Sequence, residues 1–251
     1  MNTIKAILVL AMLTVFAVAS QSPEPPLDDS RLTIHTLVRE DIFAGFLNGD
    51  MTRFARGEKN IERLLEKRPD AKADLLAWKG GATLHRAVRA AENKQPEEFK
   101  QKYQQAQELF AQARQIQPEG GGVAAVEGGS YVLHADQLPK EYRTAAWERA
   151  YTAFKILWKQ QGAGIEKFPV HFRGEVLGGL AQSAMRLGKT EEANQYLDKI
   201  LVVMRDTPYE TAAKRWKENP KSVETTSITC LNCHEGGRLA ARLAVLNKES
   251  K

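Results

Sequence analysis

Cysteine is scarce in this sequence of 251 residues, and the two that occur, Cys230 and Cys233, lie only three positions apart. Disulfides that stabilise an exported fold usually close much larger loops, so hydrophobic packing must hold this chain together. A structural zinc site needs four protein ligands, commonly from two separate clusters, and no second cysteine cluster exists. The two cysteines therefore serve a local purpose.

The sequence also lacks an apolar run long enough to cross a membrane comfortably, which takes about 20 residues. Residues 6–18 are apolar apart from Thr14, follow a start that carries Lys5, and end on the small residues 17–20. This arrangement is typical of a secretory signal peptide. We therefore predict that residues 1–20 are cleaved, and that the mature chain is periplasmic or otherwise extracytoplasmic, with no stable membrane span. An uncleaved anchor is the alternative.

No long run of Lys or Arg occurs, and the net charge of +5 is scattered along the chain, so nucleic-acid binding is not expected. Phosphate-binding and dinucleotide fingerprints and a Ser/His/Asp set are missing as well. These absences favour an electron carrier or a binding protein over an enzyme. Residues 21–30 are rich in proline and acidic residues, and they suit an extended linker.

Alternating strand patterns are missing, whereas helical periodicity runs through most of the chain, which predicts an all-α fold. A Gly-Gly pair recurs at residues 80–81, 128–129 and 178–179, spaced 48 and 50 positions apart. Each pair is expected in the first helix of a helical hairpin, where small residues allow a neighbouring helix to come close. The chain is rich in glycine, so chance recurrence is the alternative explanation.

A second helix with a small-large-medium stripe is expected after each pair, because residues 3 and 4 apart share one helix face. A similar stripe near the start of the chain indicates an additional unit. The members of the four stripes are Gly57, Ile61, Leu64; Ala106, Phe110, Ala113; Ala150, Phe154, Leu157; and Ala193, Leu197, Ile200.

These stripes resemble the second helices of tetratricopeptide repeats, most closely from Leu177 to Ile200. The resemblance implies an α-solenoid of helical hairpins over residues 31–217, and a protein partner bound by it. The period of 43 to 50 residues is longer than the 34 of that family, and an irregular helical bundle is the alternative.

The polar residues 218–226 leave the last repeat, and residues 218–251 form a separate C-terminal segment in this prediction. It contains Cys230-Leu231-Asn232-Cys233-His234, a C-x-x-C-H haem-attachment motif. Two thiols at this spacing can add to the two vinyl groups of one porphyrin, and the adjacent imidazole can ligate the iron.

The segment thus resembles c-type cytochromes, which implies one covalent haem c held by Cys230 and Cys233, with His234 as an axial ligand of the iron. Attachment of haem c takes place outside the cytoplasm, which agrees with the predicted export. The placement near the C-terminus is similar to cytochrome c prime in position only. A short helix over residues 238–247 should either cover the haem or dock on the last repeat, and simple packing on the solenoid is an equal alternative.

The sequence does not decide which residue, if any, would be the second axial ligand of the iron. A structural or redox-active Cys230–Cys233 pair without haem is a competing interpretation, although no thioredoxin-like strands accompany it. The expected function is electron transfer coupled to partner binding. The alternatives are a five-coordinate haem sensor or enzyme and a non-haem helical scaffold. His171 is the first distal ligand to test, among the candidates His35, His85, His134, His171, Met51, Met185 and Met204.

Overall fold

The fold is known from a computed structural model that describes residues 24–229 and 237–249. Within these ranges the regular structure is helical and no strand occurs, as the periodicity predicted. The α-helices are α1 (Ile34–Asn48), α2 (Met51–Lys67), α3 (Lys72–Glu92), α4 (Pro96–Ile116), α5 (Gly121–His134), α6 (Lys140–Gln161), α7 (Val170–Arg186), α8 (Thr190–Val203), α9 (Pro208–Glu218) and α10 (Arg238–Glu249).

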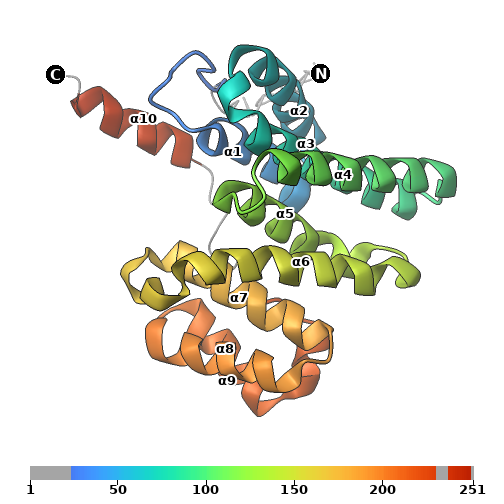
Figure 1. Ribbon diagram of the computed structural model, residues 1–251, viewed down its shortest axis with the longest axis vertical. Helices are drawn as coiled ribbons and strands as arrows, with labels where there is room; N and C mark the ends of the chain where they lie inside the picture. Colours follow the sequence, from blue (N-terminus) through green and yellow to red (C-terminus); the bar gives the residue numbers. More distant parts are fainter. Residues whose placement is uncertain (1–23, 230–236, 250–251) are drawn as a thin grey trace, which may run out of the picture.

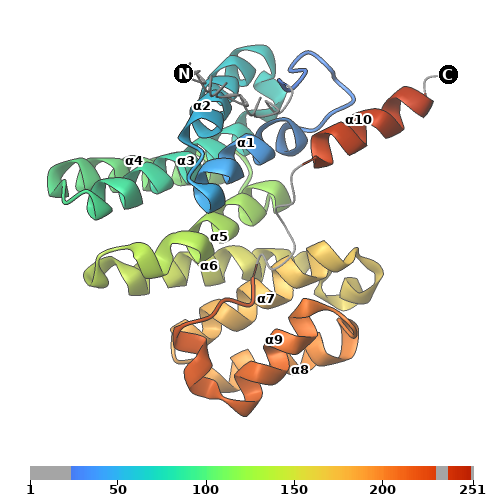
Figure 2. The ribbon, with the colours of Figure 1, turned by 180° about the vertical axis from the view of Figure 1, so that it is seen from behind.

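Consecutive helices pair as hairpins, with α1 against α2, α3 against α4, α5 against α6, and α7 against α8. The first helices of these pairs also contact one another in order, α1 with α3, α3 with α5, and α5 with α7. Figures 1 and 2 show the hairpins following one another from α1 at one end of the molecule to α8 and α9 at the other.

Glycines in the first helices let aromatic side chains of the second helices approach the backbone. A Cβ atom on Gly80 would lie 3.0 Å from the Phe110 ring, and one on Gly128 would lie 3.0 Å from the Phe154 ring. A side chain at either glycine would therefore require the phenylalanine ring to move by a few tenths of an ångström. The Gly-Gly pairs therefore lie in first helices, as predicted.

The predicted stripes of the second helices form the other half of this core. Ala106, Phe110 and Ala113 of α4 are fully buried. The corresponding residues of α2, α6 and α8 are buried as well, which confirms the faces that the spacing of 4 and 3 residues predicted.

The residues before α1 depart from the expected extended linker. Residues 24–33 contain turns and no helix, but Leu27 and Leu32 are buried in the core, with 5% and 2% of their surface exposed. Two ion pairs join this stretch to α2, Lys67 with Asp28 at 2.5 Å and Arg63 with Glu24 at 3.4 Å. The two leucines explain the difference, because burying them stabilises a packed conformation. The predicted signal peptide, residues 1–20, lies outside the described residues.

The C-terminal helix forms where it was predicted but docks elsewhere. Helix α10 contacts α1, at the opposite end of the row of hairpins from α7 and α8. Its residues Leu239 and Leu246 are buried, with 4% and 6% exposed. Docking on the last hairpin is therefore wrong, and α10 packs elsewhere on the helical body, in line with the packing alternative. Among the helices of residues 24–229 and 237–249, none combines the length and apolar character needed to span a bilayer.

Candidate functional site

The predicted haem residues Cys230, Cys233 and His234 lie outside the described residues, whereas the chain on both sides of them is described. The upstream side ends at Thr229, which lies against α7, and the downstream side begins at Gly237, just before α10. The two sides contact different ends of the row of first helices. The described part of the candidate site therefore consists of these two flanks and of the protein surface between them.

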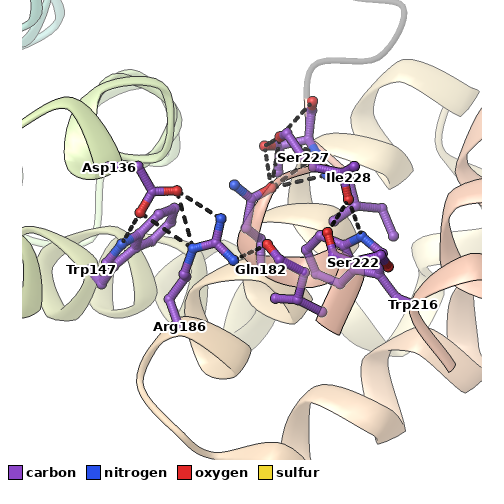
Figure 3. A network of polar contacts seen from close by, with 11 residues as sticks. Asp136, Trp147, Gln182, Arg186, Trp216, Ser222, Ser227 and Ile228 are labelled. Carbon is purple, nitrogen blue, oxygen red and sulfur yellow. Dashed lines mark hydrogen bonds and ion pairs between the residues drawn. The ribbon is translucent and has the colours of Figure 1, made fainter. Parts of the chain in front are cut away.

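A single buried side chain, Gln182 of α7, fixes the upstream flank. Its carboxamide oxygen lies 2.8 Å from Ser227 Oγ, 3.0 Å from Ile228 N, 3.0 Å from Thr229 Oγ1 and 3.4 Å from Thr229 N, all of which can donate to it (Figure 3). Only 2% of Gln182 is exposed. Because a buried backbone N–H left without an acceptor costs about 1–3 kcal/mol, Gln182 specifies where the chain enters the cysteine motif.

The backbone of the flank touches α7 directly at Gly178. A Cβ atom on Gly178 would lie 3.1 Å from the carbonyl oxygen of Ile228 and 3.3 Å from Thr229 Cγ2. Ile228 is fully buried beside it. The third Gly-Gly pair thus makes room for the segment that leads to the cysteines, a role that the repeat pattern alone did not reveal.

A charged network holds the preceding loop. Both guanidinium edges of Arg186 are used: Nε and Nη2 donate to Asp136, the latter over 2.7 Å, and Nη1 donates to the carbonyl of Val223 (Figure 3). The indole of Trp147 donates to the same carboxylate over 3.1 Å. Trp216 donates to Thr226 Oγ1 over 2.8 Å. The loop is thereby tied to α7 and α9, and through Arg186 and Asp136, which follows α5, to Trp147 of α6.

The downstream flank is attached to α1. The backbone N–H of Leu239 donates to Glu40 Oε1 over 2.8 Å, so an acidic side chain of α1 caps the first turn of α10. Gly237 takes a φ of +91°, a conformation that favours glycine, where the chain turns into the helix.

A pocket opens between these two attachment points. It lies among the first helices α1, α3, α5 and α7, and its apolar wall includes Phe43, Trp78 and Val126. Gly129 also lines it, and a Cβ added there would meet no atom nearer than Glu175 Oε1 at 3.9 Å. The described residues around the pocket are His35, Arg39, Phe43, Trp78, Ala125, Val126, Gly129, Ser130, His171 and Glu175.

Two histidines, His35 of α1 and His171 of α7, line this pocket, and each has different neighbours. His171, in the first turn of α7, has its Nε2 atom 3.7 Å from the carboxylate of Glu175. His35 of α1 packs its ring on Trp78, with centroids 5.1 Å apart, and its Nε2 lies 3.3 Å from Arg39 Nη1. The pocket is therefore lined by a basic and an acidic side chain, by two imidazoles and by aromatic rings.

The other two histidines are core residues. His85 of α3 and His134 of α5 lie with their ring centroids 5.1 Å apart, and the rings of Phe46 and Phe54 pack around them. Burial lowers the pKa of His85 to about 3, with the neighbouring His134 contributing, and burial lowers that of His134 to about 4. Both are neutral at pH 7, and the aromatic rings enclose them, so neither faces the pocket.

The methionine candidates do not line the pocket either. Met204, at the end of α8, is buried with 1% exposed, and Met51 and Met185 are partly buried against the core. The acidic pairs at residues 97–98 and 191–192 lie in the first turns of α4 and α8, where negative charge suits the helix dipole. Glu192 additionally accepts hydrogen bonds from Tyr151 and Tyr196, at 2.7 and 2.9 Å.

Within the described ranges, no three His, Cys, Asp or Glu side chains come together in a way that could hold a metal ion by themselves. Neither the role of Gln182 nor the pocket was predicted from the sequence. One signal was present: His171, Glu175, Gly178 and Gln182 follow one another at intervals of 4, 3 and 4, so they share one face of α7.

Comparison with protein-family models, with curated protein sequences and with solved structures finds no match to this chain.

Proposed function

We propose that this protein is an exported monohaem c-type cytochrome-like protein, which transfers electrons while a tetratricopeptide-like scaffold binds a protein partner. Cys230 and Cys233 would hold the haem covalently, and His234 would be an axial ligand. One observation carries the proposal: a C-x-x-C-H motif lies between two flanks that are each docked on the helical body, by Gln182 and by Glu40.

The docked flanks limit how far a group attached between them can lie from the scaffold. Eight residue steps join Thr229 to Gly237, and an extended chain covers at most about 3.5 Å per step, or roughly 28 Å in total. The surface between the flanks carries aromatic and aliphatic side chains, a guanidinium and two imidazoles, which are the kinds of group that contact a haem in proteins. The pocket itself encloses only about 30 Å³, so it could accept an edge of a porphyrin and not the whole ring.

A bound haem c would supply a one-electron iron couple, and the chain's own residues set its surroundings. Trp78, Phe43 and Val126 exclude water from one side of the pocket, and Arg39 can neutralise a carboxylate. The hairpin arrangement supports the scaffold half of the proposal, because stacked helical hairpins present extended surfaces to other proteins. The apolar residues 6–18 support an exported, periplasmic location.

The experiment is export of the full chain in a bacterial host that matures c-type cytochromes, followed by intact mass and absorption spectroscopy. We expect the N-terminus to begin near residue 21, a mass gain of one haem, and reversible reduction and reoxidation by mild mediators. Cys230→Ala with Cys233→Ala should abolish the gain. Asn232→Ser, which leaves the C-x-x-C-H pattern intact, is the matched control and should retain it.

An unmodified mass without a visible absorption band would contradict the haem and leave the non-haem scaffold with a local cysteine pair. Covalent haem that mediators cannot reduce and reoxidise would contradict electron transfer. The partner is tested separately, by crosslinking the purified holoprotein to proteins of a periplasmic extract and comparing reduced with oxidised samples.

A further inference from the structure

We propose that a second pocket, at the junction of the α3–α4 and α5–α6 hairpins, binds an aromatic side chain of an acidic peptide segment of the partner protein. This pocket encloses about 180 Å³ between the turn after α3 and the first turns of α4 and α6. The inference rests on the partner-binding half of the proposed function and names the chemistry that would recognise the partner. It does not depend on the haem.

Aromatic and proline side chains form the apolar wall of this second pocket. Phe99 of α4 and Tyr142 of α6 contact edge to face, with their ring centroids 4.9 Å apart. Pro96 and Pro139 line the pocket beside them. The ring of Tyr103 packs on both Phe99 and Tyr142, with centroids 5.6 and 5.0 Å away. Because these rings support one another, the wall is already in place before a ligand binds, which lowers the cost of binding.

The volume of the second pocket suits one six-membered ring. A protein cavity of about 150 Å³ is large enough to bind benzene, whereas sites for free small molecules usually measure about 300–1,000 Å³. The side chains of Lys94, Pro96 and Lys100 at the rim are exposed. The site therefore suits an aromatic side chain that belongs to a longer chain, with the ring in the pocket and the peptide backbone across the rim.

Two lysines at the rim indicate the charge of the ligand. Lys94, in the turn after α3, and Lys100 of α4 both line the second pocket. Lys100 also pairs with Glu97 at 3.0 Å, but both side chains are exposed, and ion pairs of this kind are weak. Glu141 lines the pocket as well, in the first turn of α6, where a carboxylate suits the helix dipole. With two ammonium groups against one carboxylate, the rim favours acidic residues beside the aromatic side chain.

The turn between α7 and α8 has the same backbone conformation as the turn between α3 and α4, but without the two lysines. In both turns one residue with a positive φ donates its N–H to the carbonyl three positions earlier, and the next residue donates to the carbonyl five positions earlier. The residue with the positive φ is Lys94 at +57° in one turn and Gly188 at +72° in the other. Six positions later, Asn194 takes the place of Lys100. A hairpin of this shape therefore needs neither lysine.

Lysine is an unfavourable residue at the position of Lys94. A side chain disfavours a positive φ, and glycine, which stands at the equivalent position 188, avoids this cost. Backbone strain of this kind is concentrated at sites that contact ligands. We therefore assign the ammonium group of Lys94 to the recognition of a carboxylate beside the pocket.

The test measures the binding of three short peptides to the full, purified protein by fluorine nuclear magnetic resonance. Each peptide is an acetylated and amidated tripeptide with para-fluorophenylalanine in the middle, flanked by two aspartates, two asparagines or two lysines. We expect the aspartate peptide to bind about 5-fold more tightly than the asparagine peptide, which is the gain that exposed ion pairs allow. The lysine peptide should bind most weakly.

The variant Lys94→Gly with Lys100→Asn gives this turn the residues of the α7–α8 turn. We expect it to lose the preference for the aspartate peptide. Lys94→Gly alone should raise the midpoint of thermal unfolding, because glycine relieves the positive φ. Lys189→Gln, which removes one positive charge from the α7–α8 turn, is the matched control and should leave binding unchanged. Tyr142→Leu, which removes an aromatic wall, should weaken the binding of all three peptides.

Equal affinity for the three peptides, or an unchanged preference in the double variant, would overturn the inference. Equally tight binding of free para-fluorophenylpropanoate would overturn it too, because the second pocket would then be a site for small aromatic acids. Crosslinking to the periplasmic extract separates the two proposals. A partner that the double variant captures with full yield contradicts only the inference about this pocket, whereas the absence of any partner contradicts the partner-binding half of the proposed function.

Discussion

The two pairs of histidines in the described part of the chain show how differently one residue type is used on the same row of helices. His85 and His134 belong to α3 and α5 and are enclosed by phenylalanine rings in the core, where burial keeps them neutral. His35 and His171 belong to α1 and α7 and line a pocket beside Arg39 and Glu175. Helices α3 and α5 also contribute to the pocket, through Trp78 and Val126, so the difference lies in the face of the helix on which each histidine stands.

The largest difference between the two pairs is expected in the free energy of unfolding, when a histidine is replaced by a negatively charged residue. His85→Glu places a carboxylate among aromatic rings, where an unpaired buried charge costs several kcal/mol. We expect it to lower the free energy of unfolding by about 4 kcal/mol or more, or to prevent folding. The matched change His171→Glu should alter it by less than about 1 kcal/mol, because that side chain is partly exposed. Urea unfolding followed by circular dichroism measures both, and equal losses would contradict the comparison.

Lowering the pH should act through the core pair. The folded-state pKa values of His85 and His134, about 3 and 4, lie below the unfolded value of 6.5, so the unfolded chain binds more protons in between. The stability contribution is complete above pH 6.5 and is lost as the pH falls towards 4, on the order of 3 kcal/mol for each histidine.

The control for this prediction is a pair of double variants. His85→Leu with His134→Leu should flatten the loss of stability between pH 7 and pH 4, as measured by urea midpoints. His35→Leu with His171→Leu should keep most of that loss. If both double variants show the same pH dependence as the unmodified protein, carboxylates and not the core histidines govern the acid transition.

A smaller loss of stability is expected when Gln182 of α7, which holds residues 227–229, is replaced. Gln182→Leu removes the acceptor of the Ile228 and Thr229 amides and should destabilise the docking of residues 227–229 by about 1–3 kcal/mol. Hydrogen exchange at these two amides should accelerate by one to two orders of magnitude. Gln160→Leu, at an exposed position that bonds only Glu119, should leave the exchange unchanged.

Much of the hairpin architecture was predictable because it depends on local spacing. The stripe of Ala106, Phe110 and Ala113 and the Gly80-Gly81 pair each lie within one or two turns of helix, and burial of a face follows from period 3.6. The pocket was not predictable in the same way. His35 and His171 are separated by 136 positions, since 171 minus 35 is 136, and nothing local brings them together.

The docking errors have the same origin. The apolar stripe of α10 predicted that the helix packs, but it did not say on which part of the body, and the helix packs on α1, at the far end of the row of first helices. Gln182 reads as an ordinary polar residue on a helix, and only the approach of residues 227–229 shows why it is buried. Contacts across large sequence separations decided both outcomes.

The contact between Glu40 and Leu239 spans 199 positions, so it joins the earliest helix to the last one. A chain that emerges from its N-terminus can assemble its hairpins one after another, but this closing contact must wait until residue 239 is available. Loop closure over such a length slows its formation relative to local pairs. In sequence the cysteines lie between the last hairpin, which can form early, and α10, whose contact with α1 forms late.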